Sequence, residues 1–254
     1  MSIQRTLIHI LLAVACACTV FAQTAPDEFE RGNAFYRDGK YDQAALSYES
    51  ILKQGLTSSS LFFNIGNCYY RMGKIAPAIL AYERALRLQP NDADIKHNLN
   101  LVNLKTLDRI EPLPELFFIE WLRSFSAVVP LHMTARLFAA CWLLLFAALS
   151  MLYLLANSAA FRFLRGLVIT AALALIPLTV VLVTQIADSR NRSDAVVMVS
   201  VVTAKTSPDA QSLDAFVAHE GLKVKLSDAV GEWMKIVLPD GKVGWIRAQD
   251  CKRI

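Results

Sequence analysis

Residues 31–52 read RGNAFYRDGKYDQAALSYESIL, and residues 65–86 read IGNCYYRMGKIAPAILAYERAL. Aligned at a spacing of 34 residues, the two segments share glycine, alanine and tyrosine in one register. The identical pairs include Gly32 and Gly66, Gly39 and Gly73, Ala44 and Ala78, and Tyr48 and Tyr82. Several identities at one spacing indicate an internal repeat. We therefore predict that residues 25–92 hold two copies of one structural unit.

The residue types in each copy predict two antiparallel helices. Gly39 and Gly73 would end the first helix of each unit, because glycine accepts a positive φ. The earlier glycine would let the paired helices approach closely, and the tyrosine would fill the gap to the next unit. Pro90 would stop the last of these helices because it has no N–H to donate. Asp92 or Asp94 would then cap a further helix.

This 34-residue period resembles the tetratricopeptide repeat (TPR). The resemblance implies an all-α TPR superhelix over 23–109, with repeats at 25–58 and 59–92 and a capping helix at 93–109. Two repeats and a cap lie near the minimum of about three units for a stable stack. The chain departs from the TPR pattern at one position of the first helix, where the pattern has a tryptophan. Glu28 stands there in the first copy and Phe62 in the second.

The TPR resemblance also implies a groove, lined by the first helices, that binds a peptide or a partner helix. Asn33 and Asn64 match the two asparagines of TPRs that clamp a terminal carboxylate. Asp94 and Asn98 stand at the cationic positions of that clamp, which puts a clamp in doubt. An ordinary solvated groove wall is the alternative interpretation. The inward-facing positions are Asn33, Arg37, Asn64, Asn67 and Arg71.

Two long segments without a charged residue follow the repeats, at 137–156 and 166–187. A helix needs about 20 apolar residues to cross a bilayer, so both segments predict transmembrane helices. The connection at 157–165 is short, which predicts an antiparallel helical hairpin. Charged residues make up 19% of the chain, against about 25% in soluble proteins. The composition therefore favours a membrane protein with polar modules.

Residues 1–22 have the features of a secretory signal peptide, with Arg5 ahead of an apolar core. A lipoprotein signal with Cys16 or Cys18 as the lipidated residue, and an uncleaved anchor, are the alternatives. All three place the following residues outside the cytoplasm. The sequence thus predicts a two-pass protein of the bacterial inner membrane, with a cytoplasmic turn at 157–165 and both polar modules in the periplasm.

A linker over 110–135 joins the repeats to the first span. Its first part reads IEPLPELFFIEWLRSF, in which Pro112 and Pro114 stiffen the chain. The apolar residues that follow predict a short juxtamembrane helix, with Trp121 at the depth of the lipid headgroups. Packing of this helix on the last helix of the repeats is the alternative interpretation.

The pattern changes to strand-like alternation over residues 195–254. Leu222, Val224 and Leu226 alternate with lysines, and Pro239-Asp240-Gly241 has the composition of a hairpin turn. Short strands at this spacing predict a small all-β barrel. The order VVTAKTSP, HEGLKVKL and GEWMKIVLPDGKVGWI is similar to bacterial SH3-like (SH3b) domains. That similarity implies a module that binds peptide or peptidoglycan.

Trp233 and Trp245 are the candidates for a binding face on this module. Packing in the core is the alternative for either ring, because an indole is a large apolar filler in so small a domain. Cys68 and Cys251 are the cysteines that would face an oxidising compartment. We expect two unpaired thiols there, with a disulfide between them as the alternative.

Several classes of function have no support in the sequence. The four histidines share no metal-ligand spacing, and the net charge of +4 is scattered rather than gathered into a basic patch. Neither a Ser–His–Asp arrangement nor an HExxH or phosphate-binding motif is present in the polar parts. We therefore expect no metal, no cofactor, no nucleic acid and no catalysis. A membrane transporter is a weaker alternative, since the spans carry no internal ionisable residue.

The whole order closely resembles the BatE proteins of the Bacteroides aerotolerance (Bat) operons, and the IEPLPELFF linker adds most to the match. The resemblance implies a scaffold within a Bat membrane complex. It implies as partners Bat membrane proteins with von Willebrand factor A domains and, indirectly, a MoxR-type AAA+ ATPase. It also implies a role in tolerance to oxygen or envelope stress. The alternative is a cell-envelope factor that its SH3-like domain targets to peptidoglycan.

Overall fold

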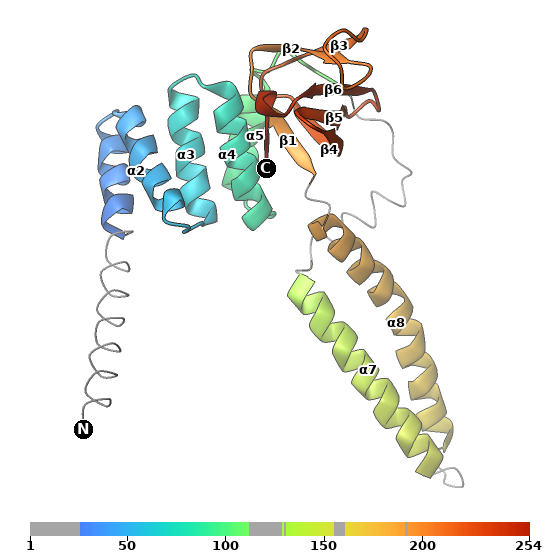
Figure 1. Cartoon of the computed structure of the whole chain (residues 1–254). Coiled ribbons are helices and arrows are strands. Elements are labelled where there is room, and N and C mark those ends of the chain that lie inside the picture. The colour runs from blue at the N-terminus through green and yellow to red at the C-terminus, as the bar shows by residue number, and fades with distance from the viewer. Residues whose placement is uncertain (1–25, 112–128, 130, 155–160, 191–192) are drawn as a thin grey trace, which may run out of the picture. The chain divides into compact units, whose positions relative to one another are not determined.

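A computed structural model describes residues 26–111, 129, 131–154, 161–190 and 193–254 (Figure 1). The chain divides into two compact units. One unit combines the helical repeats with the C-terminal sheet, and the other holds the two apolar helices. The predicted signal peptide, most of the predicted linker and part of the predicted turn lie outside the described residues.

Antiparallel helices in succession form the first part of the chain (Figure 1). A helix over residues 26–37 is followed by α2 (Tyr41–Lys53), α3 (Ser59–Arg71), α4 (Ile75–Leu88) and α5 (Ala93–Asn103). Each of α3, α4 and α5 packs on the helix before it. This arrangement confirms the helical repeats.

The helix ends follow from local chemistry. Gly39 and Gly73 have φ values of 75° and 74°, and each comes two residues after the end of its helix, as expected. Of the two candidate caps for α5, Asp92 is the one used, because its carboxylate accepts the N–H groups of Asp94 and Ile95.

The predicted capping helix over 93–109 is too long, since α5 ends at Asn103. The N–H of Lys105 donates to the Val102 carbonyl at 3.0 Å, so the last turn tightens. The Thr106 hydroxyl donates to the Asn103 carbonyl at 2.8 Å and thus takes an acceptor that a longer helix would use.

In each repeat, the two helices pack closely where a tyrosine ring of the second helix lies against a glycine of the first. A Cβ on Gly32 would lie 2.5 Å from Cε1 of Tyr48, and a Cβ on Gly66 would lie 2.6 Å from Cε1 of Tyr82. Both rings are 1% exposed. The close approach predicted at each glycine is therefore made with the tyrosine of the same repeat, whereas the sequence placed that tyrosine at the gap to the next unit.

The C-terminal part is a seven-stranded antiparallel sheet. Its strands are β1 (Asp194–Val197), β2 (Val201–Lys205), β3 (Asp214–His219), β4 (Lys223–Val230), β5 (Trp233–Val237), β6 (Val243–Arg247) and β7 (Cys251–Arg253), with a 3-10 turn, η1 (Ala248–Asp250), before β7. The predicted hairpin turn joins β5 to β6, and Gly241 has a φ of 86° there.

The predicted closed barrel is not confirmed, because the sheet is open. Its strand order is β3-β2-β6-β5-β4-β1-β7. Closure would require β3 to pair with β7, yet within the described residues β3 pairs with β2 and β7 pairs with β1. The strand β7 has only three residues, which leaves little backbone for a further ladder.

The sheet packs against α4, the second helix of the second repeat. Strand β1 is buried on both faces: Ala195 and Val197 belong to the core of the sheet, while Val196 joins the apolar cluster that contains Ile79 of α4. Lys223 Nζ lies 2.8 Å from the Glu83 carboxylate.

Two further groups of polar contacts join the sheet to the repeats. Arg84 of α4 donates to the Arg253 carbonyl at 2.7 Å. Asp108, after α5, accepts the backbone N–H of His219 at 2.7 Å and lies 2.8 Å from its Nδ1. Burial is the largest single influence and would lower the pKa of Lys223, but the carboxylates of Glu83 and Asp194 together outweigh it, so this pKa is raised.

The second unit contains α7 (Leu131–Leu154) and α8 (Phe161–Arg190), which pack on each other. Both are long and apolar enough to cross a membrane, with mean hydropathy of 2.3 and 2.6 over an 18-residue stretch of each. They fit a membrane protein. Both also extend past the predicted spans: α7 begins six residues before position 137, and residues 161–165, predicted as turn, belong to α8. No glycine or proline occurs in either extension, so nothing in their composition ends the helices there.

Candidate functional site

A groove of about 180 Å³ lies along the repeats, and we call it the repeat groove. The helix over 26–37 contributes a tyrosine, α3 contributes most of the middle, α5 contributes the far side, and α4 contributes one ring. The lining residues are Tyr36, Asn67, Tyr70, Arg71, Tyr82, Asn98 and Leu101. None of the seven is acidic. The groove thus combines aromatic rings, amides and one cation.

Asparagine–tyrosine hydrogen bonds repeat along the stack. The Tyr48 hydroxyl donates to Asn33 Oδ1 at 2.7 Å, and the Tyr82 hydroxyl donates to Asn67 Oδ1 at 2.7 Å. Asn98 Nδ2 also donates to Asn67 Oδ1, at 2.9 Å. These amide oxygens therefore hold neighbouring helices together, which is a structural role that the sequence did not suggest.

The same pairing explains the place of Asn64. Its side chain lies close enough to Tyr48 to lower the pKa of that hydroxyl in part, as the side chain of Asn98 does for Tyr82 one repeat later. Burial raises the pKa of Tyr48 to about 12, so this hydroxyl keeps its proton at neutral pH. Of the five predicted groove residues, Asn67 and Arg71 line the repeat groove, whereas Asn33 and Asn64 meet at Tyr48.

Arg71 is held at the rim of the groove by an aromatic partner. Its Nε and Nη2 donate to the Tyr41 hydroxyl at 3.2 Å and 2.8 Å, and its guanidinium carbon lies 5.2 Å from the centre of that ring. Tyr36 meets the same ring edge-on, with centroids 5.2 Å apart. Arg71 therefore has a defined position although it is exposed. The fifth predicted residue, Arg37, is exposed at the end of the first helix.

The sequence reasoning missed several groove residues. Tyr36, Tyr70 and Leu101 line the groove but are not among the five predicted groove residues. Lys105 was not considered, although its Nζ lies 4.2 Å from the centre of the Tyr70 ring. The 34-residue spacing, continued from Arg71 into the third unit, would have found it.

Residues 59–92 match the family model of the tetratricopeptide repeat. The match runs from the start of α3 to the N-cap of α5, and so covers the second helical pair. No curated protein matches the sequence of the chain. The TPR is a non-catalytic unit, and its presence together with two apolar helices indicates a membrane protein that binds other proteins.

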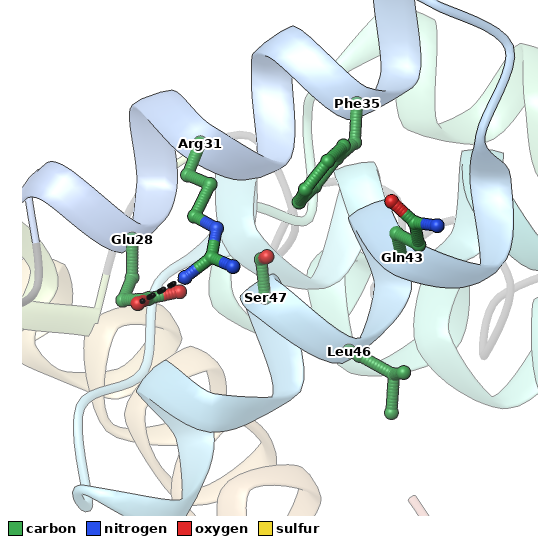
Figure 2. Close-up of a pocket in the computed structure, with 6 residues that line it drawn as sticks. All are labelled: Glu28, Arg31, Phe35, Gln43, Leu46 and Ser47. Atoms are coloured by element: carbon green, nitrogen blue, oxygen red, sulfur yellow. Dashed lines mark hydrogen bonds and ion pairs between the residues drawn. The ribbon is translucent and has the colours of Figure 1, made fainter.

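A second hollow lies on the outer face of the first repeat (Figure 2). Figure 2 shows Arg31 turned toward Glu28, and their charged atoms lie 3.4 Å apart. The lining residues are Glu28, Arg31, Phe35, Gln43, Leu46 and Ser47.

The second repeat has an equivalent of this face, which contacts the first repeat. The residues 34 positions later are Phe62, Ile65, Tyr69, Pro77, Leu80 and Ala81, and they line a hollow shared with residues of α2. Leu46 is 64% exposed, whereas its equivalent Leu80 is 6% exposed. In the described part of the chain, the first repeat is therefore the outer end of the stack.

The two tryptophans of the sheet differ in exposure. Trp245 is 9% exposed, with Lys235 Nζ 5.9 Å from its ring centre. Trp233 is half-buried, and the Arg247 guanidinium lies 5.6 Å from its ring. Packing accounts for most of the Trp245 surface, while Trp233 keeps an accessible part.

The cysteines that the structure describes are all free thiols. Cys68 is buried in the core of the repeats and Cys251 in the core of the sheet, so the alternative of a disulfide between them is not what the structure shows. Burial raises the pKa of Cys68 to about 12. Across the described ranges, no three His, Cys, Asp or Glu side chains gather in a way that could hold a metal ion.

Proposed function

We propose that this chain is a non-catalytic adaptor of the bacterial inner membrane that binds a partner protein in the repeat groove. The groove itself carries this proposal. Side chains from three successive units converge in it, and none of its seven lining residues belongs to the sheet. The sheet packs mainly on α4 and does not line the repeat groove.

The chemistry of the groove suits a peptide segment. Tyr36, Tyr70 and Leu101 supply apolar contact, and Leu101 is 38% exposed. The hydrogen bonds among Asn67, Asn98 and Tyr82 join α3, α4 and α5 beside these groups before any partner arrives. Preorganised aromatic groups bind with a small loss of conformational entropy.

We further propose that the partners are Bat membrane proteins with von Willebrand factor A domains, linked indirectly to a MoxR-type AAA+ ATPase. The support is the order of segments: helical repeats, a proline-rich linker, two apolar helices and a β module. Aerotolerance or resistance to envelope stress would be the process that this complex serves.

A second candidate is a cell-envelope factor whose β module, SH3-like in its sequence motifs, binds peptidoglycan or peptide. The observation that favours it is the accessible part of Trp233 beside Arg247. Aromatic rings next to cations suit both kinds of ligand. Binding of isolated peptidoglycan to the full chain, with loss on Trp233→Ala, is the result that would favour this candidate over the adaptor.

Recovery of crosslinked partners from native membranes tests the adaptor. We expect Leu101→Glu, which places a carboxylate in the apolar part of the repeat groove, to reduce partner recovery about tenfold or more, as for a substitution at an interface hot spot. Leu46→Glu is the matched control, because it makes the same change at an exposed leucine on the outer face of the first repeat. Equal recovery from both variants would exclude the groove as the docking face.

Single engineered cysteines test the proposed placement in the periplasm. Thr57→Cys in the repeats and Gln211→Cys in the sheet lie at exposed positions. We expect both to react with a membrane-impermeant maleimide in cells whose inner membrane is intact. Cys68 would remain silent, because a buried thiol with a raised pKa has little reactive thiolate.

Arg162→Cys, exposed at the start of α8, is the control on the other side of the membrane. It should react only after the inner membrane is permeabilised. Labelling of Arg162→Cys before permeabilisation would contradict the proposed topology. So would a failure of Thr57→Cys or Gln211→Cys to react with the maleimide in intact cells.

A further inference from the structure

Three cations occupy equivalent positions in the three successive units of the stack. They are Arg37, Arg71 and Lys105, and each follows the one before it by 34 residues. Arg37 and Arg71 are the last residues of their helices, and Lys105 comes two residues after the end of α5. All three are exposed. The repeat geometry therefore places one cation per unit along the same side of the stack.

Contacts place Arg71 and Lys105 at the rim of the repeat groove, and the repeat geometry continues the row to Arg37. Arg71 lines the groove. Lys105 Nζ lies 4.2 Å from the centre of the Tyr70 ring, and Tyr70 is a groove residue. Arg37 follows Tyr36, which lines the groove from the first unit. The row thus borders the aromatic and apolar part of the site.

The negative end of a helix dipole favours a nearby cation, which partly accounts for these residue types. That effect corresponds to about half an elementary charge at each helix end, so it does not neutralise a full positive charge. In the described part of the chain, no ion pair includes Arg37, Arg71 or Lys105. The groove lining has no carboxylate either. The three cations at the rim therefore have no ion-pair partner within the described ranges.

We propose that the repeat groove takes an extended acidic segment of the partner protein. Its carboxylates would meet the row of cations, and its apolar side chains would lie on Tyr70 and Leu101. Opposite charge along a shared edge raises the rate of encounter and sets the register of the bound chain. This inference rests on the proposed function, since it names the chemistry of the partner for the same groove.

The direct test is binding of a dye-labelled decapeptide of alternating Glu and Leu to the full chain in nanodiscs of neutral lipid. We expect saturable binding that weakens as salt rises from about 50 to 300 mM, because salt screens exposed charges. A decapeptide of alternating Gln and Leu should bind at least about tenfold more weakly. Equal binding of the two peptides would overturn the proposal.

The variant for this test combines Arg37→Gln, Arg71→Gln and Lys105→Gln, which removes the row but keeps polar side chains. We expect about a tenfold or larger loss of affinity for the acidic peptide. The matched control combines Lys53→Gln, Lys96→Gln and Lys225→Gln, three exposed lysines with the same total charge. Equal losses in the two triple variants would mean that only net charge matters, and the proposal would fall. Unchanged circular dichroism melting confirms that both variants fold.

Anionic lipid is another negatively charged ligand that the cations could bind. Binding to lipid vesicles distinguishes it from the acidic peptide. If the triple variant loses binding to vesicles that contain phosphatidylglycerol but keeps its affinity for the acidic peptide, the cations serve a lipid surface and the proposal fails.

Partner recovery separates this inference from the function on which it rests. Loss of the native partner with Leu101→Glu but not with the triple variant would leave the groove as a docking face and overturn its acidic partner. No loss with Leu101→Glu would overturn both.

Discussion

Replacing Tyr82 with alanine should lower the free energy of unfolding of the helical repeats by about 3–5 kcal/mol, the usual cost of removing a large buried aromatic ring. The ring is 1% exposed and lies on Gly66. Its loss would leave a cavity between α3 and α4 and remove the donor to Asn67. Hydrogen exchange of the α3 and α4 amides, followed by mass spectrometry, measures the local free energy of opening.

Tyr82→Phe is the control for this prediction, because it keeps the ring and removes only the hydroxyl. Its expected cost is about 1 kcal/mol, the usual worth of one hydrogen bond. Similar costs for the alanine and phenylalanine variants would show that the ring does not hold the repeat together.

A valine in place of Gly66 should destabilise the repeats by about 3 kcal/mol or more, at the upper end of what overpacking costs. The added Cβ would lie 2.6 Å from Cε1 and 2.7 Å from Cδ1 of Tyr82. The ring is buried and cannot move aside without separating the helices. The same hydrogen exchange measurement on α3 and α4 reports the loss.

A double-mutant cycle isolates this contact. Combined with Tyr82→Leu, which shortens the facing side chain, Gly66→Val should cost at least about 1 kcal/mol less than it does alone, since the two positions are in contact. Gly73→Ala is the control for replacing a glycine without creating a steric clash. No atom lies within 4 Å of its Cβ position, so only its positive φ opposes the change. Additive costs at positions 66 and 82 would contradict the packing described.

The repeats could be predicted because their bounds depend on local chemistry. Gly39 and Gly73 end helices through a backbone conformation that disfavours other residues, and an aspartate caps α5 through its own neighbours. The apolar helices could be predicted because composition alone decides whether a segment suits a bilayer. Predictions failed where a competing bond or a distant strand decides the outcome, as at Thr106 and at the open sheet.

The candidate site was only partly predictable. Asn67 and Arg71 were identified from their inward-facing positions in the repeat, yet the same reasoning could not show that Asn33 accepts a hydrogen bond from Tyr48. Hydrogen bonds between helices depend on how the helices pack, and residue types alone do not specify it. Lys105 was missed for a different reason, because the period was followed only to the end of the second copy.

By itself, the sequence determined the two helical repeats, the two apolar helices and the strand-rich end, since spacing, composition and turn residues act within a few residues along the chain. Tertiary structure alone decided that asparagine side chains accept hydrogen bonds from the buried tyrosines. It also decided that β1 is buried between the sheet and α4, and that three cations border one groove. Those features depend on residues from 15 to 140 positions apart, and only the packing of whole helices and strands brings such residues together.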